Sequence, residues 1–384
     1  MKQGWEIKKL GEVCNKLTDG SHNPPKGVTF SNYEMLSSQN IFNDKINYQD
    51  VKYISYDDFL KEDKRTSVRD GDILLTIVGT IGRCAVFTGG KNVTLQRSVA
   101  VIRTKDGNSR FLMYCFIGKN LLLNECAHGI AQKGLYLKQL YQIEVPVPPR
   151  EEQERIVAEL DCLSGIIEKK REQLKELDAL AQSIFYQMFG DPITNEKGWE
   201  VKKLGEVGKV ITGNTPSTKD EENYSSNDYC FVKPSDIGKD YVTNIEKTEF
   251  YISDKAFSQS RKLCKGSVLT TCIGIIGKVG ILKVDATCNQ QINAILPNDN
   301  YISEYVAWAI YLTRSVIEDI ANAPVVPIIN KGEFSNIVIP LPPKDLQQKF
   351  ADKIALIEKQ KQLIKESIAQ TEELFNSRMD YYFN

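Results

Sequence analysis

The sequence predicts an α/β protein with two tandem domains, each followed by one long helix, and the two helices are expected to pair as an antiparallel coiled coil. Three observations favour this architecture: a length of 384 residues, an internal duplication, and a heptad-like apolar pattern after each copy. A chain of this length exceeds one ordinary core, but it suits two domains of about 150 residues plus connectors.

The duplication is visible in a repeated decapeptide. GWEIKKLGEV begins at Gly4, and GWEVKKLGEV begins at Gly198. Nearly the same shift aligns RDGDILLTIVGTIGRCAVF with CKGSVLTTCIGIIGKVGIL, and VPPREEQERIVAEL with LPPKDLQQKFADKI. Two copies are too few for a solenoid, in which many small units stack on one another. We therefore expect two similar domains that present similar surfaces.

Each copy is expected to begin with a short extended segment or turn and to continue through strands. In GDILLTIVGTIGRCAVF, Ile, Val and Thr cluster between glycines, which is typical of strands. The segments GTIG and GIIG lack the G-x-G-x-x-G spacing, so their glycines indicate hairpins or bulges rather than a phosphate site. A short helix, a polar loop and a last strand that ends in Pro-Pro complete each copy.

After each Pro-Pro pair, the apolar pattern changes from the period of a strand to that of a coiled coil. Each run of about 40 residues would span roughly 60 Å as a helix. Because the second domain must return the chain, antiparallel pairing is expected; packing of each helix on its own domain is the alternative. Lys361 and Arg378 are among the polar residues that interrupt the pattern. The seam is predicted to contain Ile156, Leu160, Leu163, Ile167, Leu174, Leu177, Ile354, Ile357, Ile364 and Ile368.

These patterns predict a first domain at 1–146, a helical region at 147–190, a second domain at 191–340 and a second helical region at 341–384. No apolar run approaches the ~18 residues that a membrane helix needs. The opening residues lack the apolar core of a secretory signal. We therefore expect a cytoplasmic protein.

Composition alone does not indicate a partner. The net charge is −1, although residues 1–149 carry an excess of Lys and Arg and could form a basic face. The nine cysteines include no CxxC pair and are odd in number, which argues against a disulfide framework and a zinc site. With only His22 and His128 as imidazole ligands, no metal site is expected. Most thiols are expected to be reduced core residues.

Sequence motifs do not favour catalysis. The segment SHNPPKG at Ser21 resembles the Asn-Pro-Pro-aromatic motif of amino-methyltransferases, but Lys26 stands where the stacking ring would be. The sequence contains no phosphate-loop, H-E-x-x-H or G-x-S-x-G motif. We therefore expect a binding protein without catalytic residues. The SHNPPKG segment is expected to be an exposed loop that either contacts DNA or forms a plain solvated turn.

Polar loops recur at matched places in the two copies, namely TDGSHNPPK and TGNTPSTK, TLQRS and CNQQIN, and AHGIAQKGLY and APVVPIINKGEF. Arg, Lys, Asn and Gln on well-held loops can read base edges, and Lys, Arg, Ser and Thr can anchor phosphates. An ordinary surface role is the alternative for each residue. The DNA-contact candidates are His22, Asn23, Lys26, Gln96, Arg97 and Lys133 in the first copy, and Asn214, Thr215, Lys219, Gln290, Gln291 and Lys331 in the second.

The order of these elements, repeated twice, resembles the specificity subunits of bacterial type I restriction-modification enzymes over essentially the whole chain. The motifs that carry the resemblance are GWE.KKLGEV, TG.TPS, GD.L.T..G.IG and P.PP..EQ. The resemblance implies two target recognition domains, each reading one half of a split DNA site, with the helical regions as a ruler. It implies a subunit that has no catalytic activity alone and binds no cofactor itself.

The resemblance also implies partners. Two modification subunits would use AdoMet to methylate adenine N6, and motor-nuclease restriction subunits would use ATP and Mg²⁺. Because the loops between the shared motifs differ between the copies, the two half-sites are expected to differ. Domains that overhang a helical rod of ~60 Å can approach a spacing of ~34 Å, so the half-site centres are expected about one turn of DNA apart. A DNA-recognition subunit of a related type II system, a DNA-binding adapter, and a scaffold without a DNA partner remain the alternatives.

Overall fold

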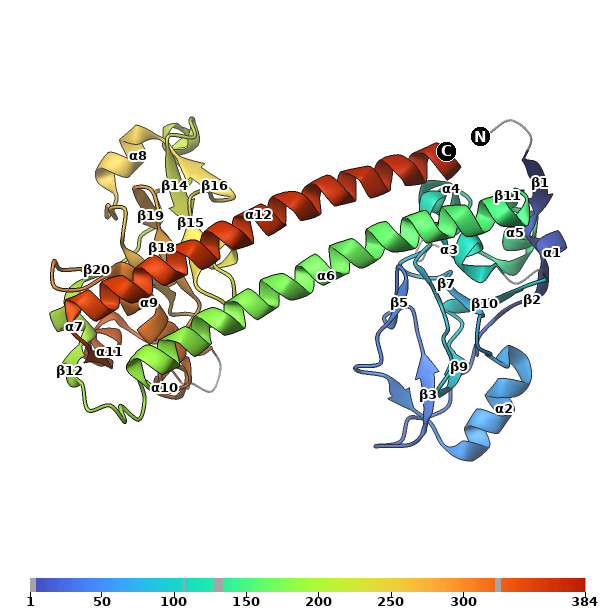
Figure 1. Ribbon diagram of the computed structural model, residues 1–384, viewed down its shortest axis with the longest axis horizontal. Coiled ribbons are helices and arrows are strands. Elements are labelled where there is room, and N and C mark those ends of the chain that lie inside the picture. Colours follow the sequence, from blue (N-terminus) through green and yellow to red (C-terminus); the bar gives the residue numbers. More distant parts are fainter. Residues whose placement is uncertain (1–4, 106–107, 128–133, 322–325, 384) are drawn as a thin grey trace. The chain divides into compact units, whose positions relative to one another are not determined.

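The computed structural model describes residues 5–105, 108–127, 134–321 and 326–383, except for the side chains of 120–122. The chain forms two compact units, whose elements are labelled in Figure 1. Unit 1 combines Met1–Lys169 with Ser367–Asn384, and unit 2 contains Lys170–Glu366. Each unit therefore contains one α/β domain and parts of both long helices.

The two domains contain short strands and helices, and each ends in a 40-residue helix. The elements of the first copy are β1 (Glu6–Lys9), α1 (Leu10–Val13), β2 (Cys14–Asp19), β3 (Tyr33–Leu36), β4 (Ile41–Phe42), β5 (Lys45–Ile46), β6 (Lys52–Tyr53), α2 (Tyr56–Thr66), β7 (Ile73–Thr76), β8 (Cys84–Val86), β9 (Asn92–Leu95), β10 (Val99–Thr104), α3 (Ser109–Gly118), α4 (Asn120–Glu125), α5 (Leu137–Gln142), β11 (Glu144–Val147) and α6 (Arg150–Phe189). Those of the second copy are β12 (Glu200–Lys203), α7 (Leu204–Val207), β13 (Gly208–Thr212), the 3₁₀ helix η1 (Glu221–Tyr224), β14 (Tyr229–Val232), the 3₁₀ helix η2 (Pro234–Asp236), β15 (Thr243–Ile245), β16 (Phe250–Ile252), α8 (Asp254–Gln259), β17 (Val268–Thr271), β18 (Val279–Leu282), β19 (Ala286–Cys288), β20 (Ile292–Pro297), α9 (Ser303–Leu312), α10 (Arg314–Ile320), α11 (Lys331–Asn336), β21 (Val338–Leu341) and α12 (Lys344–Phe383).

The two domains share one sheet topology. Unit 1 has a four-stranded antiparallel sheet in the order β2-β10-β7-β8 and a three-stranded mixed sheet in the order β6-β3-β9. Unit 2 repeats these sheets as β13-β20-β17-β18, extended by β15, and as β16-β14-β19. The first and last strands of each domain pair with each other, β1 with β11 and β12 with β21. The predicted tandem α/β architecture is therefore confirmed, and the strand order is common to the two copies.

The repeated glycine segments form tight turns between antiparallel strands. GTIG connects β7 to β8, and GIIG connects β17 to β18. Gly79 and Gly82 have φ angles of 82° and 90°, and Gly274 and Gly277 have φ angles of 78° and 76°. Residues with a Cβ atom rarely adopt this region, which explains why both copies carry glycine there. The predicted hairpins are confirmed.

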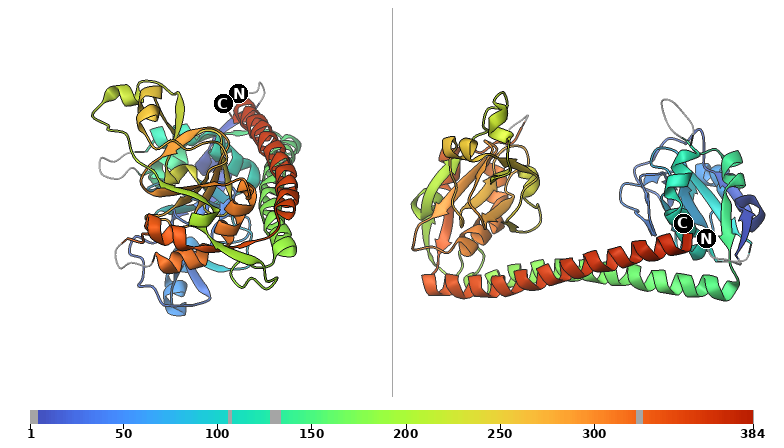
Figure 2. Two further views of the ribbon diagram at one scale, coloured as in Figure 1. Left: turned by 90° about the vertical axis from the view of Figure 1, so that its left-hand side faces the viewer. Right: turned by 90° about the horizontal axis from the view of Figure 1, so that it is seen from above.

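Within each unit, the two long helices run antiparallel and lie side by side (Figure 2). In unit 1, the Arg378 guanidinium pairs with the Glu159 carboxylate. In unit 2, Lys361 Nζ lies 2.8 Å from Asp178 Oδ1. Higher residue numbers on α6 therefore pair with lower residue numbers on α12, as expected for antiparallel helices. Lys361 and Arg378 interrupt the apolar pattern because they form ion pairs between the helices.

The long helices also close the core of each domain. Ile156 near the start of α6 and Phe383 at the end of α12 are buried in the unit 1 core. Phe350 near the start of α12 and Phe185 near the end of α6 are buried in the unit 2 core. The predicted seam therefore faces both the other helix and the domain. Of the seam residues, Ile156, Leu160, Ile167, Ile354, Ile357 and Ile368 are buried, and Leu163, Leu174, Leu177 and Ile364 are half-buried.

Replacing Glu159 with Gln tests the helix pairing in unit 1. The hydrogen bond from the Arg378 side chain lowers the pKa of Glu159. Such a carboxylate contributes stability that is present above its unfolded-state pKa of about 4.3 and is lost as the pH falls through the lower folded-state pKa. We expect Glu159→Gln to reduce the free energy of unfolding by about 1 kcal/mol near pH 7. The deficit should shrink as urea unfolding is repeated at progressively lower pH.

A matched control for this change is Glu154→Gln, which removes an exposed ion pair with Arg150 on the same helix. Exposed pairs one helical turn apart contribute about 0.3–0.5 kcal/mol, so its effect should be smaller. A Glu159→Gln deficit that stays constant down to strongly acidic pH would contradict the assignment.

Candidate nucleic-acid interface

One loop in each domain lies directly against the segment that follows β9 or β19. Gly20 N donates to Val99 O at 3.1 Å, and Gly213 N donates to Ile292 O at 3.0 Å. A Cβ atom on Gly20 would lie 2.1 Å from the carbonyl oxygen of Leu95, and one on Gly213 would lie 2.2 Å from that of Asn289. Real Cβ atoms do not approach so closely, so only glycine allows either loop to pack here.

Backbone hydrogen bonds then establish which residues correspond between the domains. Gln96 N donates to the last carbonyl of β3 at 2.8 Å, and Asn289 N donates to the last carbonyl of β14 at 3.1 Å. Gln96 therefore corresponds to Asn289, and Arg97 corresponds to Gln290. Arg97 and Gln290 are both exposed. The same framework thus presents an arginine in one copy and a glutamine in the other.

In unit 1, these loops surround a concave site of about 580 Å³. The segment after β7 and the segment before α5 form its other walls, joined by a β-bridge between Val78 and Gly134. Tyr136 is 64% exposed, which leaves its ring available for contact with a ligand. The side chains that line the site include Asp19, His22, Arg65, Val78, Arg97, Tyr136 and Lys138.

Asp19 holds the basic side chains of this concave site in place. Its carboxylate is buried and pairs with the Arg65 guanidinium. Arg65 Nε also donates to the Asp19 backbone oxygen at 2.9 Å, and His22 Nε2 lies 2.8 Å from Asp19 Oδ2. The side chains of Arg65 and His22 remain 47% and 57% exposed. One buried acid therefore orients two exposed donors toward the same opening.

The predicted residues of the first copy only partly come together. His22 and Arg97 line the concave site, and Gln96 precedes Arg97 in the chain. Asn23 is exposed beside His22. Lys26 is displaced, because the chain next to it turns toward β6, where Val28 N donates to Tyr53 O at 2.9 Å. The prediction for Lys133 falls outside the described residues.

The second copy holds its polar side chains in a different way. Thr215 Oγ1 donates to Gln290 Oε1 at 2.7 Å, and both side chains are exposed. Asn214 Oδ1 accepts from Arg261 N at 2.9 Å, so this amide supports the loop. Gln291 Oε1 accepts from the Asn289 side chain at 2.9 Å, which commits its oxygen to an internal contact.

The two lysines predicted in the second copy are both exposed. Lys331 is the first residue of α11, and the chain before it is tied to this region because Ile329 N donates to Cys272 O at 3.0 Å. Lys219 lies in the loop before η1, where its N–H donates to Ser217 Oγ at 3.4 Å. Thr215 and Gln290 therefore form the one contact between predicted side chains that this copy shows among its described residues.

Sequence reasoning missed four residues that the structure brings to these loops: Arg65, Tyr136, Lys138 and Arg261. Arg65 lies at the end of α2, and Arg261 lies just after α8. Both donate to backbone carbonyls of the equivalent loops, Arg261 Nη1 to Thr212 O at 2.8 Å. The available signal was a pair of basic residues in the last turn of the short polar helix in the first copy, KR, and just after that helix in the second copy, RK.

Two core thiols of the second copy are not placed for nucleophilic chemistry. Burial raises the pKa of Cys272 and Cys288 to about 12, so both remain protonated near neutral pH. Within the described parts of the chain, no group of three His, Cys, Asp or Glu side chains could hold a metal ion. No helix in those parts is long and apolar enough to cross a membrane. The geometry is that of a polar binding surface.

Comparison with known proteins identifies the class. The model of the type I restriction modification DNA specificity domain matches residues 2–178 and 196–373. The chain belongs to this family and carries its domain twice. It is therefore a DNA specificity subunit of the type I restriction-modification class with two target recognition domains in tandem, called TRD1 and TRD2 below for the α/β domains of units 1 and 2.

Similar proteins agree with this assignment, and a solved structure shares the fold. The Escherichia coli EcoR124I/EcoR124II specificity subunit is 27% identical over 298 residues, which cover 74% of this chain and 72% of that protein. The Methanocaldococcus jannaschii MjaIX specificity subunit is 34% identical over 160 residues, but this match covers 40% of this chain and 37% of that protein. The S subunit from M. genitalium has the same fold, with a TM-score of 0.59, 13% identity, and coverage of 98% of this chain and 95% of that one.

Proposed function

We propose that TRD1 and TRD2 each read one half of a bipartite site in double-stranded DNA through the loops described above. The family assignment supports a DNA ligand, and the repeated framework supports two separate readings. This chain would supply specificity and no catalytic group. Two modification subunits would bind AdoMet and methylate adenine N6, and restriction subunits would bring ATP and Mg²⁺.

The observation that carries the proposal is the equivalence of Arg97 and Gln290. Both are exposed at the same position of one framework, but they suit different bases. Arginine donates two hydrogen bonds to guanine O6 and N7, and glutamine pairs with adenine N6 and N7. Thr215 fixes the amide of Gln290 by donating to its oxygen. Different half-sites for TRD1 and TRD2 follow from this difference.

The other basic residues would anchor the DNA backbone. Arg65, His22 and Lys138 surround the opening of the TRD1 concave site, and their donors suit phosphate oxygens. Asn23, Lys26, Lys133, Lys219 and Lys331 are proposed as further backbone contacts, and Gln96, Asn214, Thr215 and Gln291 as side chains that hold or extend the base-reading loops. Phosphate contacts make affinity fall steeply with salt, whatever the base sequence.

Substituting Arg97 and Gln290 tests this assignment in the assembled complex. We expect Arg97→Ala to reduce discrimination at one half-site by roughly tenfold, and Gln290→Ala to do the same at the other, because each bidentate contact contributes about 1–3 kcal/mol. The measurement is duplex binding by fluorescence anisotropy with single-base changes in each half-site, repeated across a salt series.

Lys26→Ala is the matched control, because Lys26 lies on the loop of His22 but apart from the concave site. It should weaken all duplexes equally or not at all. Equal effects of Arg97→Ala on both half-sites, or on every duplex alike, would refute base reading by this loop. An affinity that is insensitive to salt would argue against a DNA partner altogether.

A further inference from the structure

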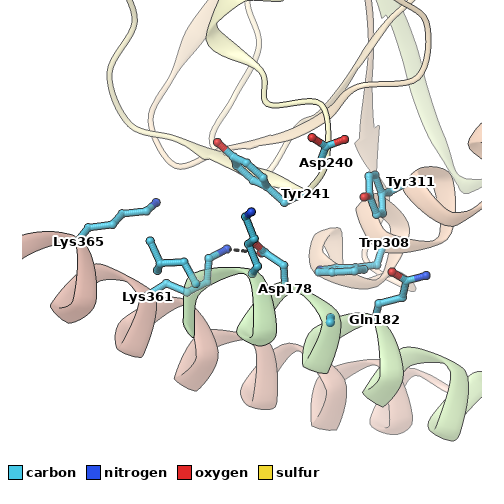
Figure 3. Close-up of a pocket in the computed structure, with 11 residues that line it drawn as sticks. Asp178, Gln182, Asp240, Tyr241, Trp308, Tyr311, Lys361 and Lys365 are labelled. Atoms are coloured by element: carbon cyan, nitrogen blue, oxygen red, sulfur yellow. Dashed lines mark hydrogen bonds and ion pairs between the residues drawn. The ribbon is translucent and has the colours of Figure 1, made fainter. Parts of the chain in front are cut away.

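A cluster of charged and polar side chains joins TRD2 to the helix pair of unit 2. Lys361 of α12 is 4% exposed. Its Nζ lies 2.8 Å from Asp178 Oδ1 on α6 (Figure 3). It also lies 2.8 Å from Glu358 Oε1 on α12. Burial lowers the pKa of Lys361, but the hydrogen bonds to these two carboxylates outweigh it, so the pKa is raised and the ammonium stays charged.

TRD2 reaches this cluster through one loop and one strand. Asn244 of β15 donates to Glu358 Oε2 at 3.2 Å. The Tyr241 ring, which hangs over the helices in Figure 3, lies with its centroid 5.3 Å from Lys361 Nζ. We call Lys361, Asp178, Glu358, Asn244 and Tyr241 the Lys361 latch. It connects both helices to the same edge of TRD2.

The latch lies beside a cavity between TRD2 and the helices. The cavity has a volume of about 530 Å³ and is lined by residues of both sides, among them Asp240, Trp308 and Lys365. Tight packing occurs further along α6, where the Phe185 ring stacks on that of Tyr305 at 5.6 Å. Seven residues of helix separate Phe185 from Asp178, which is about 10 Å. TRD2 therefore packs on the helices through an apolar core that includes Phe185 and Tyr305, and the polar latch adds directional contacts beside that core.

Unit 1 uses a latch of a different composition. Arg110 of α3 donates through Nη1 and Nη2 to the Asp44 carboxylate, at 3.0 Å each, and through Nε to the carboxylate of Asp161 on α6 at 2.8 Å. Asp44 lies in the turn between β4 and β5. The corresponding residue in α9 is Glu304, which pairs with Lys283 instead. The two latches therefore occupy different positions in the duplicated framework.

Stability alone is a weak explanation for the Lys361 latch. Replacing a buried ion pair by apolar side chains of similar volume is often neutral or stabilising. Directional hydrogen bonds, however, define an angle in a way that apolar packing does not. In a two-domain DNA reader, the angle of each domain matters, because one base pair of spacer corresponds to a shift of about 3.4 Å and a rotation of about 34°.

We propose that Lys361 and Arg110 are positioning residues that fix the angle of each recognition domain on the helices, and so restrict the subunit to one spacer length between half-sites. This inference rests on the proposed reading of a bipartite site. Among the described residues, the hydrogen bonds of Lys361 and Arg110 do not involve the loops that would read bases, so the half-site sequences are expected to be independent of the latches.

The test is Lys361→Met in the complete complex, with adenine methylation mapped by single-molecule sequencing. The expected result is the wild-type half-sites with methylation at spacers one base pair shorter or longer raised about tenfold, the change that follows from losing one charge-assisted hydrogen bond. Lys361→Arg should restore the single spacer. Lys365→Met, on an exposed residue one turn along the same cavity wall, should leave the spacer unchanged.

An unchanged spacer in a folded Lys361→Met complex would overturn the inference, and so would a change in the bases of either half-site. Should Lys361→Met fail to fold, Asn244→Ala removes the hydrogen bond from TRD2 to Glu358 and leaves both ion pairs of Lys361 intact. It should relax the spacer in the same way, and an unchanged spacer would again overturn the inference. Absence of any split motif with the wild-type chain would instead refute the proposed function.

Discussion

Exchanging residues 1–146 for the corresponding domain of another specificity subunit should replace one half-site of the methylated motif and leave the other half-site intact. The reason is structural: TRD1 is closed by the pairing of β1 with β11 and has its own sheets, so its loops are built without any part of TRD2. The measurement is genome-wide adenine methylation in cells that express either chain with the same partner subunits.

The reciprocal exchange of 191–340 is the control and should change only the other half. A change of both half-sites after either exchange would contradict modular reading. Because α3 and the turn after β4 also carry Arg110 and Asp44, an incoming domain that lacks them should accept additional spacer lengths while its half-site bases stay defined.

Gly20→Ala should abolish recognition of the TRD1 half-site. The new Cβ would lie 2.1 Å from the carbonyl oxygen and 2.3 Å from the carbonyl carbon of Leu95. Backbone atoms cannot yield as a flexible side chain would, so the loop that carries His22 must move away from Arg97. Overpacking of this kind costs about 1–3 kcal/mol. We expect a lower free energy of unfolding and loss of methylation at sites that depend on TRD1.

Gly165→Ala is the matched control, because a Cβ atom there meets nothing within 4 Å. Gly165 lies inside α6, where alanine is favoured over glycine by about 1 kcal/mol, so this change should stabilise the protein. Methylation by Gly20→Ala at the wild-type level would show that the packing of this loop is not needed for recognition.

The architecture could be predicted because the sequence contains two similar copies of the same motifs in the same order. Repeated glycines, Pro-Pro stops and heptad spacing are local signals, and all survive in the structure. Strand order could not be predicted, because β2 pairs with β10 across most of the domain and nothing local records that contact. Lys361 was interpreted as an interruption of the seam, since its partner Asp178 lies far away in the sequence.

Part of the candidate interface could also be predicted from the sequence. Arg97 and Gln290 stood out because polar loops recur at matched places, and the structure places them at equivalent exposed positions. Arg65 and Tyr136 were not among the predicted residues, because only the folded structure brings α2 and the start of α5 next to the loop of His22. Lys26 shares that loop in sequence, but the chain beside it turns toward β6 before it can join the concave site.

The proposal that this chain directs methylation to a bipartite DNA site is tested by mapping adenine methylation across the host genome. The map is read by single-molecule sequencing with and without this gene. We expect deletion to remove methylation from one split motif, at an adenine in each half, with the half-sites centred about one turn of DNA apart. Methylation that is identical in both strains, while the chain and its partner subunits are expressed, would contradict the proposal.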